Sequence, residues 1–138
     1  MIQRYDTTYS QKGNKDCVII TLANHLRVSY ENVILAAESI GVTPELIAKR
    51  GVLTSEIDKL LIRLCPFSIW QVRNPRRGQE KITGFARWHS VKGKPGHLNY
   101  IKAGMVYDTD GWQYSIDDYR RYFKINKLER IWVQVRRF

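Results

Sequence analysis

The chain has 138 residues, of which 43% are hydrophobic and 12% aromatic, so we expect one globular domain over residues 1–138. Its two cysteines are too few for a disulfide framework, and the sequence contains neither a signal-peptide core nor an apolar run of membrane-spanning length. These totals argue against a disordered chain, a disulfide-rich secreted scaffold and a helical membrane protein. We therefore expect a soluble cytoplasmic protein with reduced thiols and no membrane partner.

The net charge of +10 is distributed unevenly along the chain. Residues 1–62 carry as many acidic as basic side chains, so the whole excess of positive charge arises from residues 63–138. A basic half predicts an acidic partner, which could be nucleic acid or an acidic protein, or else a charged face that only keeps the protein in solution. No nucleic-acid-binding motif accompanies the charge, so composition does not choose between these interpretations.

The first half of the chain has the apolar spacing of helices, beginning with an apolar run directly after Cys17. We expect helices in segments 17–26, 29–41, 43–51 and 53–64, with Ser29, Thr43 and Thr54 as N-caps and Gly41 and Gly51 at the ends. Pro66 then ends a helical part that covers about residues 16–65.

From Phe67 onward the pattern changes to short segments rich in aromatic and β-branched residues, which is typical of strands. We expect strands at 67–72, 81–88, 97–101, 105–108 and 131–138, a tight turn at Ala103-Gly104, and a short helix at 115–123 capped by Ser115. A helical first half followed by an antiparallel sheet over about residues 67–138 predicts the α+β class.

Cys17, His97 and Asp108 follow one another in the order of a nucleophile, a base and an orienting carboxylate. The unpaired N–H groups at a helix start lower the pKa of a thiol placed there. An imidazole within hydrogen-bonding reach stabilises the thiolate and protonates the leaving group, and a carboxylate behind the imidazole fixes its tautomer. A two-residue turn at 103–104 would make His97 and Asp108 near neighbours across a hairpin, so we expect a Cys-His-Asp triad.

Four further residues are candidates for roles around this triad. Gln11 lies six positions before Cys17, and we expect its side-chain amide to form an oxyanion hole together with the backbone N–H of Cys17. Trp88 and Trp112 flank the expected hairpin, so we expect them to wall a substrate groove. Gly96, directly before the candidate histidine, is expected to contact the substrate as well.

Each of these residues also has an ordinary structural interpretation. Cys17 can be an inert thiol in the core, and Asp108 can be a turn residue, in which case Asp110 is an alternative orienting carboxylate. A metal site from His89, His97 and one cysteine is conceivable, but no short pair of ligands supports it. We therefore expect no cofactor.

The motif Q-K-G-N-K-D-C at residues 11–17, followed by an apolar helix, resembles the start of the papain-like peptidases that remove double-glycine leader peptides in bacteriocin exporters. The segments S-Y-E-N-V-I-L-A-A-E-S-I-G-V and R-G-V-L-T-S-E-I-D-K-L-L are similar to the helical region of that family, and G-H-L-N-Y-I with G-M-V-Y-D-T-D-G is similar to its hairpin. The resemblance spans about residues 11–111. Val18 stands where the family usually has Gly, so we expect a different channel beside the thiol, and Thr109 replaces a common Pro.

The resemblance implies a papain-like fold in which Cys17 is the nucleophile, His97 the general base and acid, Asp108 the orienting residue and Gln11 the oxyanion donor. It thus implies a cysteine peptidase that hydrolyses a peptide or isopeptide bond, and the same constellation also serves deamidation and transamidation. Because the 138 residues contain no transporter portion, we do not expect exporter-type leader processing. The basic second half suggests a substrate protein that is acidic or bound to nucleic acid.

The alternative is a basic binding protein, encoded by a phage or mobile element, that uses a papain-like scaffold to engage nucleic acid or an acidic host protein. Its working surface would consist of the basic residues that cluster in the second half, which are Arg73, Arg76, Arg77, Lys81, Arg87, Lys92 and Lys94.

Overall fold

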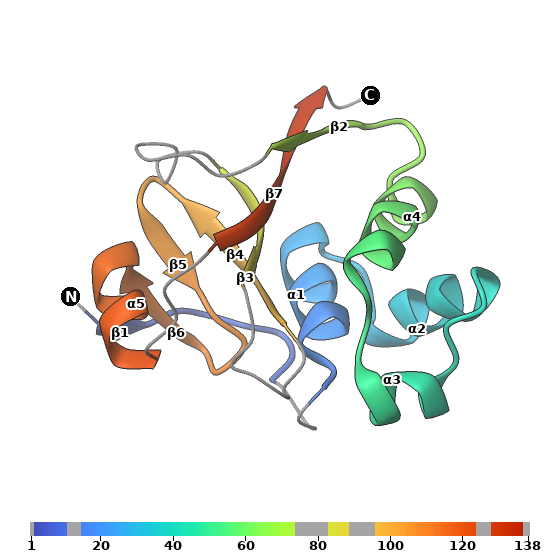
Figure 1. The fold of residues 1–138 in the computed structure, drawn as a ribbon, viewed down its shortest axis with the longest axis horizontal. Coiled ribbons are helices and arrows are strands. Elements are labelled where there is room, and N and C mark those ends of the chain that lie inside the picture. Colours follow the sequence, from blue (N-terminus) through green and yellow to red (C-terminus); the bar gives the residue numbers. More distant parts are fainter. Residues whose placement is uncertain (1, 11–14, 74–82, 89–95, 124–127, 137–138) are drawn as a thin grey trace.

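The computed structural model describes residues 2–10, 15–73, 83–88, 96–123 and 128–136. In this part of the chain, five helices and one seven-stranded antiparallel sheet form a mixed α/β fold (Figure 1). The helices are α1 (Cys17–Leu26), α2 (Tyr30–Ser39), α3 (Pro44–Arg50), α4 (Thr54–Leu64) and α5 (Ile116–Phe123). The strands are β1 (Ile2–Arg4), β2 (Ile69–Arg73), β3 (Gly84–Trp88), β4 (His97–Lys102), β5 (Met105–Tyr107), β6 (Trp112–Ser115) and β7 (Leu128–Arg136). None of the helices in these ranges has the length and apolar character that a membrane span requires.

The sheet has the strand order β1-β6-β5-β4-β3-β7-β2 and lies between two groups of helices (Figure 1). Helices α1 to α4 share one apolar core with Phe85 and Leu98 of the sheet. Helix α5 shares a second core with Ala86 and Trp88, which alternate with Phe85 along β3 and so face the other side. The two cores explain why every residue of β3 is buried.

The helical part forms largely as the sequence predicts. Ser29 and Thr43 are the N-caps of α2 and α3, each accepting the backbone N–H three residues further on. The prediction of Thr54 as a cap was wrong, because Thr54 is already the first residue of α4 and Leu53 takes the N-cap position. The carboxylate of Glu56 accepts the backbone N–H of Leu53 at 2.8 Å, which satisfies the helix start without a capping side chain at Leu53.

The β4–β5 hairpin has the expected two-residue turn. Ala103 and Gly104 both adopt positive φ angles, 52° and 79°, as a turn of this length requires. Tyr100 pairs with Tyr107, which lies within the expected register. Two short strands were missed in the sequence, β1 and β6, and they pair with each other from Ile2 opposite Tyr114 to Arg4 opposite Trp112.

Helix α1 is attached to the sheet by a buried hydrogen bond close to the candidate site. The hydroxyl of Thr21 donates to the carbonyl oxygen of Leu98 at 3.0 Å, and both residues are almost completely buried. Thr21 lies one turn beyond Cys17, and Leu98 directly follows His97. This bond therefore fixes the beginning of α1 against the beginning of β4.

We predict that Thr21→Val, which keeps the side-chain shape but removes the donor, lowers the free energy of unfolding by about 1–2 kcal/mol. Urea denaturation followed by circular dichroism measures the change. Thr8→Val is the matched control, because Thr8 is exposed and should change stability by less than about 0.5 kcal/mol. Equal effects of the two substitutions would contradict a specific role for the Thr21–Leu98 bond.

Candidate active site

Cys17 is the first residue of α1, and its side chain is only 5% exposed. The preceding residue, Asp16, is the N-cap, and its carbonyl oxygen accepts the N–H of Ile20 as the first bond of the helix. Val18 and Ile19 are fully buried, so the apolar side of α1 holds the helix start against the core. Because Cys17 is the first residue of α1, its thiol lies at the positive end of the helix dipole.

His97 and Asp108 come together at the open end of the β4–β5 hairpin. His97 is the first residue of β4, and Asp108 directly follows the end of β5. Nε2 of His97 lies 2.5 Å from Oδ1 of Asp108, and the Asp108 side chain is only 6% exposed. The backbone N–H of Thr109 donates to the same oxygen at 2.9 Å, and the hydroxyl of Tyr5 donates to the carbonyl oxygen of Asp108.

The carboxylate that contacts His97 is that of Asp108 rather than that of the alternative, Asp110. The carboxylate of Asp110 accepts the backbone N–H of Trp112 at 3.0 Å and the hydroxyl of Tyr114 at 2.7 Å. These bonds place Asp110 in the turn before β6, which is the structural role that the sequence left open for either aspartate.

The imidazole of His97 lies close enough to the thiol of Cys17 for each to shift the pKa of the other. Because Nε2 of the ring faces Asp108, Nδ1 is the nitrogen that remains for the sulfur. The structure thus brings Cys17, His97 and Asp108 together in the order that the sequence predicts. The three residues come from α1, β4 and the end of β5.

The electrostatics of this pair favour charge separation. Burial raises the pKa of Cys17, but this effect is outweighed by the hydrogen-bonding and charge of His97, a backbone hydrogen bond at Leu98 and the charge of Arg87. The pKa of the thiol therefore falls below its ordinary value. Burial lowers the pKa of His97, but the hydrogen bonds to Asp108 and Cys17 outweigh it, so the pKa of the imidazole rises above its ordinary value. Between these two shifted values the pair is a thiolate and an imidazolium.

Gly96 lies beside the thiol, where a larger residue would not fit. Its carbonyl oxygen is 4.0 Å from Sγ of Cys17. A Cβ on Gly96 would lie 2.9 Å from Nε of Arg87 and 3.0 Å from the carbonyl oxygen of Trp88. The backbone at Gly96 can therefore approach Arg87 and Trp88 this closely only because it carries no side chain. Its contact with a substrate stays a prediction.

The remaining expected site residues have different outcomes. Gln11 lies outside the described residues. The expectation that Trp88 walls a groove was wrong, because its side chain is fully buried and its indole N–H donates to Oδ1 of Asn99 at 2.9 Å. Trp112 is half-buried, with the guanidinium of Arg4 5.1 Å from its ring, and its role toward a substrate stays a prediction.

Arg87 was missed as a neighbour of the thiol and was assigned wrongly to a basic surface. It lies within β3, is 5% exposed, and donates from Nη2 to the carbonyl oxygen of Val52 at 2.8 Å. The signal in the sequence was its place inside the apolar strand G-F-A-R-W, where both neighbours are hydrophobic. Of the other residues of that expected surface, Arg73 is half-buried and donates to the side chain of Gln71, and the rest lie outside the described residues.

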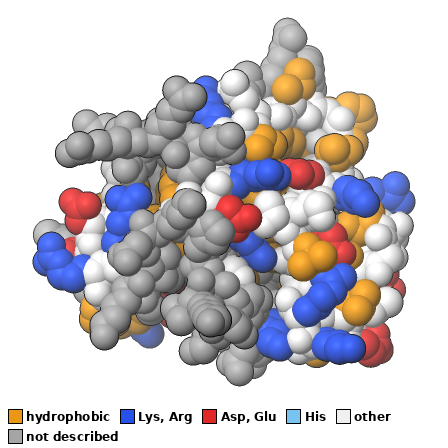
Figure 2. All heavy atoms as spheres, viewed as in Figure 1, with side chains coloured by type: hydrophobic (Ala, Val, Ile, Leu, Met, Phe, Trp, Pro, Cys, Tyr) orange, Lys and Arg blue, Asp and Glu red, His pale blue; other side chains and the backbone are white. Residues whose placement is uncertain are grey.

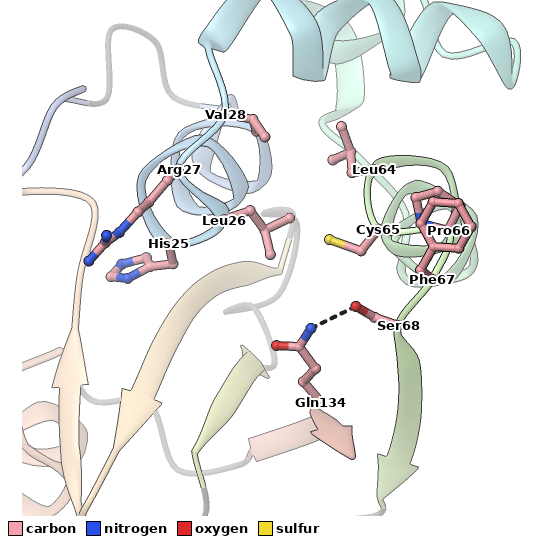
Figure 3. Close-up of a pocket in the computed structure, with 10 residues that line it drawn as sticks. All are labelled: His25, Leu26, Arg27, Val28, Leu64, Cys65, Pro66, Phe67, Ser68 and Gln134. Atoms are coloured by element: carbon pink, nitrogen blue, oxygen red, sulfur yellow. Dashed lines mark hydrogen bonds between the residues drawn. The ribbon is translucent and has the colours of Figure 1, made fainter. Parts of the chain in front are cut away.

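A separate cavity of about 560 Å³ lies at the other end of α1 from Cys17 (Figure 3). Cys65 points into it, and Gln134 donates to the hydroxyl of Ser68 at 2.8 Å on its lower side. His25 also lines this cavity, and burial lowers its pKa to about 4, so the ring is neutral near pH 7. The cavity contains none of the three triad residues, so it is distinct from the candidate active site.

Comparison of the chain with protein-family models, with curated proteins and with solved structures finds no match.

The shifted pKa values lead to a prediction for the reactivity of Cys17. The pKa of the thiol is lowered, so the thiolate persists at lower pH than an ordinary cysteine thiolate does and is lost as pH falls through the lowered pKa. Asp108→Asn removes the charge that stabilises the imidazolium, and we expect it to move the midpoint of Cys17 alkylation upward by about one pH unit. Iodoacetamide rates measured by mass spectrometry across a pH series give the midpoint.

Asp110→Asn is the matched control, because it removes an equal charge two residues away that does not contact His97. The midpoint for Cys17 should stay within about 0.3 pH units of the unsubstituted protein. An identical shift in both variants would show that Asp108 acts only through the general field of the protein.

Proposed function

We propose that this protein is a thiol-dependent acyl-transfer enzyme, and most directly a cysteine peptidase that hydrolyses a peptide or isopeptide bond. The single observation that carries the proposal is the placement of the His97 imidazole, which is bonded to the buried carboxylate of Asp108 and lowers the pKa of the neighbouring Cys17 thiol. A thiolate, a proton donor and an orienting carboxylate are the three groups that this chemistry needs.

In the first half of the reaction, the Cys17 thiolate attacks the carbonyl carbon of the scissile bond, and a carbon–sulfur bond forms while the carbonyl oxygen takes up negative charge. The backbone N–H of Cys17 has no partner within α1, since the first residues of a helix donate to nothing in the helix, and it is our candidate donor to this oxyanion. We assign the second donor to the side chain of Gln11. The imidazolium of His97 then gives its proton to the departing amine as the carbon–nitrogen bond breaks.

In the second half, neutral His97 removes a proton from water, and the resulting hydroxide attacks the thioester. The carbon–sulfur bond breaks, the acyl group leaves as a carboxylic acid, and the thiolate and imidazolium are restored. Transamidation replaces this water with an amine, and deamidation replaces the departing amine with ammonia. We favour hydrolysis of a peptide or isopeptide bond among these three outcomes.

Two further features support the proposal. The nucleophile begins a helix that packs on an antiparallel sheet carrying the histidine, which is the arrangement of a papain-like scaffold. Both cysteines are free thiols in the structure, which fits a reducing, cytoplasmic setting for a thiolate nucleophile. The substrate class implied by the basic second half is an acidic protein.

The binding-protein alternative has less support among the described residues. Arg87, one of its proposed surface residues, is buried. On the face shown in Figure 2, the described Lys and Arg side chains are interspersed with Asp, Glu and hydrophobic side chains and form no continuous basic stripe. The enzyme is therefore our preferred function.

A peptide that ends in a vinyl sulfone tests the proposal, because a catalytic thiolate adds to it and retains the label. We expect one adduct per chain at Cys17, located by peptide mass spectrometry, and a labelling rate at least about tenfold lower in His97→Ala. The matched control is Cys65→Ala, which removes the other thiol and should label at the unsubstituted rate. Labelling that is as fast at Cys65 as at Cys17, or that is unaffected by His97→Ala, would refute the proposed nucleophile.

A further inference from the structure

Arg87 places a positive charge inside the protein next to the candidate nucleophile. Arg87 is 5% exposed, and within the described part of the chain its guanidinium makes one hydrogen bond, from Nη2 to the carbonyl oxygen of Val52 at 2.8 Å. Its other two nitrogens, Nε and Nη1, are buried and have no hydrogen-bond partner among the described residues. A buried guanidinium with two unsatisfied donors is costly unless an anion compensates its charge.

The guanidinium of Arg87 packs against Gly96, the residue whose carbonyl oxygen lies near the Cys17 thiol. The Cβ position of Gly96 is 2.9 Å from Nε of Arg87 and 3.2 Å from Cζ, so the guanidinium packs directly on the backbone of Gly96. The carbonyl oxygen of the same glycine is 4.0 Å from Sγ of Cys17. In the sheet, Arg87 pairs with Leu98, and the next residue of β3 pairs with His97. One glycine thus separates the guanidinium from the sulfur.

Two anionic groups interact with Arg87, and they differ in burial. Glu129 on β7 is half-buried and accepts the hydroxyl of Thr54 at 3.4 Å, so solvent shares its charge. The thiol of Cys17 is 5% exposed and carries a charge only as a thiolate. A neutral thiol would leave Arg87 with Glu129 as its compensation, whereas a thiolate compensates it within the protein interior.

We propose that Arg87 is a positioning residue of this site, whose permanent positive charge stabilises the Cys17 thiolate alongside the imidazolium of His97. The inference rests on the proposed role of Cys17 as nucleophile and adds a second residue that activates it. It follows that the resting thiolate has two cationic partners, one that titrates and exchanges protons and one that does neither.

The second cation has a distinct use in the reaction. His97 loses its positive charge when it gives its proton to the leaving amine, and at that point it no longer stabilises negative charge at the sulfur. Burial lowers the pKa of Arg87, but a guanidinium keeps its proton throughout the pH range in which proteins are folded. Arg87 therefore keeps its positive charge near the sulfur while His97 is neutral, and it acts together with the restored imidazolium when the thioester breaks and the thiolate leaves.

The charged and titratable groups that act on this sulfur, directly or through a neighbour, come from several elements of the fold. They are Arg87 on β3, His97 on β4 and Tyr119 on α5, while Asp108 after β5 acts on His97 and Glu129 on β7 acts on Arg87. Asp16 directly precedes Cys17 in the chain. A change in Cys17 titration must therefore be compared with a substitution that removes an equal charge elsewhere.

The test measures the midpoint of Cys17 alkylation by iodoacetamide across a pH series in Arg87→Gln, Arg87→Lys and the unsubstituted protein. We expect Arg87→Gln to raise the midpoint by about one pH unit, so that the rate at a pH below both midpoints falls about tenfold. Arg87→Lys keeps a positive charge and should give a smaller rise. A role in packing alone would make the two variants alike in midpoint, and this result, like an unchanged midpoint in Arg87→Gln, would overturn the inference.

Arg130→Gln is the matched control, because Arg130 pairs directly with Arg87 across β3 and β7 but its side chain contacts Asp58 and the ring of Trp132. It should leave the Cys17 midpoint unchanged, and a rise equal to that of Arg87→Gln would overturn the inference. If circular dichroism shows that Arg87→Gln does not fold, Glu129→Gln tests the same inference by changing the partner of Arg87 instead of Arg87 itself. Removing the carboxylate that competes for Arg87 should lower the midpoint, and an unchanged or higher value would overturn the inference.

The same measurements separate this inference from the proposed function. If the midpoint for Cys17 in the unsubstituted protein is not below that in the urea-unfolded protein, the proposed activated nucleophile fails. If that midpoint is low but Arg87→Gln does not raise it, only the role of Arg87 fails.

Discussion

The contact between the thiol of Cys17 and the imidazole of His97 joins the two parts of this fold, and the candidate site exists only where those parts meet. Cys17 belongs to the helical part and His97 to the sheet, so neither part alone carries the chemistry. The apolar core shared by α1 to α4 and one face of the sheet holds the parts together, and the buried bond from Thr21 to Leu98 sets their position one residue away from His97. Packing free energy and site geometry are therefore coupled: a change that loosens α1 from β4 also separates the thiol from its base.

The carboxylate end of the site depends on a different set of long-range contacts. Asp108 is positioned by the hairpin register and by the N–H of Thr109, both of which are local. Its backbone carbonyl also accepts the hydroxyl of Tyr5, which follows the first strand of the chain. The backbone N–H of Tyr5 donates to the carbonyl oxygen of Gly111 at 3.0 Å, in continuation of the β1–β6 pairing. The amino-terminal strand thus holds Tyr5 against the backbone of Asp108, so this three-residue strand helps to position the carboxylate that contacts His97.

What the sequence predicted correctly depends on local chemistry, and what it did not predict depends on long-range partners. Helices α2 and α3 follow from the caps Ser29 and Thr43, and the hairpin follows from two turn residues, so the meeting of His97 with Asp108 could be foreseen. Strands β1 and β6 contain few residues and little alternation, and they are strands only because they pair with each other. The burial of Trp88 and Arg87 follows from the position of β3 between β4 and β7, with a core on each face of the sheet; the apolar neighbours of Arg87 indicate burial, but alternation within five residues does not reveal the second core.

The charges of the site explain how so many ionisable groups can share one buried region. Along the chain of contacts from Asp108 to His97 to Cys17, a carboxylate is followed by an imidazolium and a thiolate, and the proposed contribution of Arg87 adds a second cation. Each charge then has a neighbour of opposite sign, which is the condition under which burial of charge is tolerated. Loss of any one charge removes part of the compensation of its neighbours, so the effects of single substitutions in this set are not expected to add. The shifted protonation states of Cys17 and His97 are in this sense a property of the whole alternating array, and the fold stabilises the array by surrounding it with the two apolar cores.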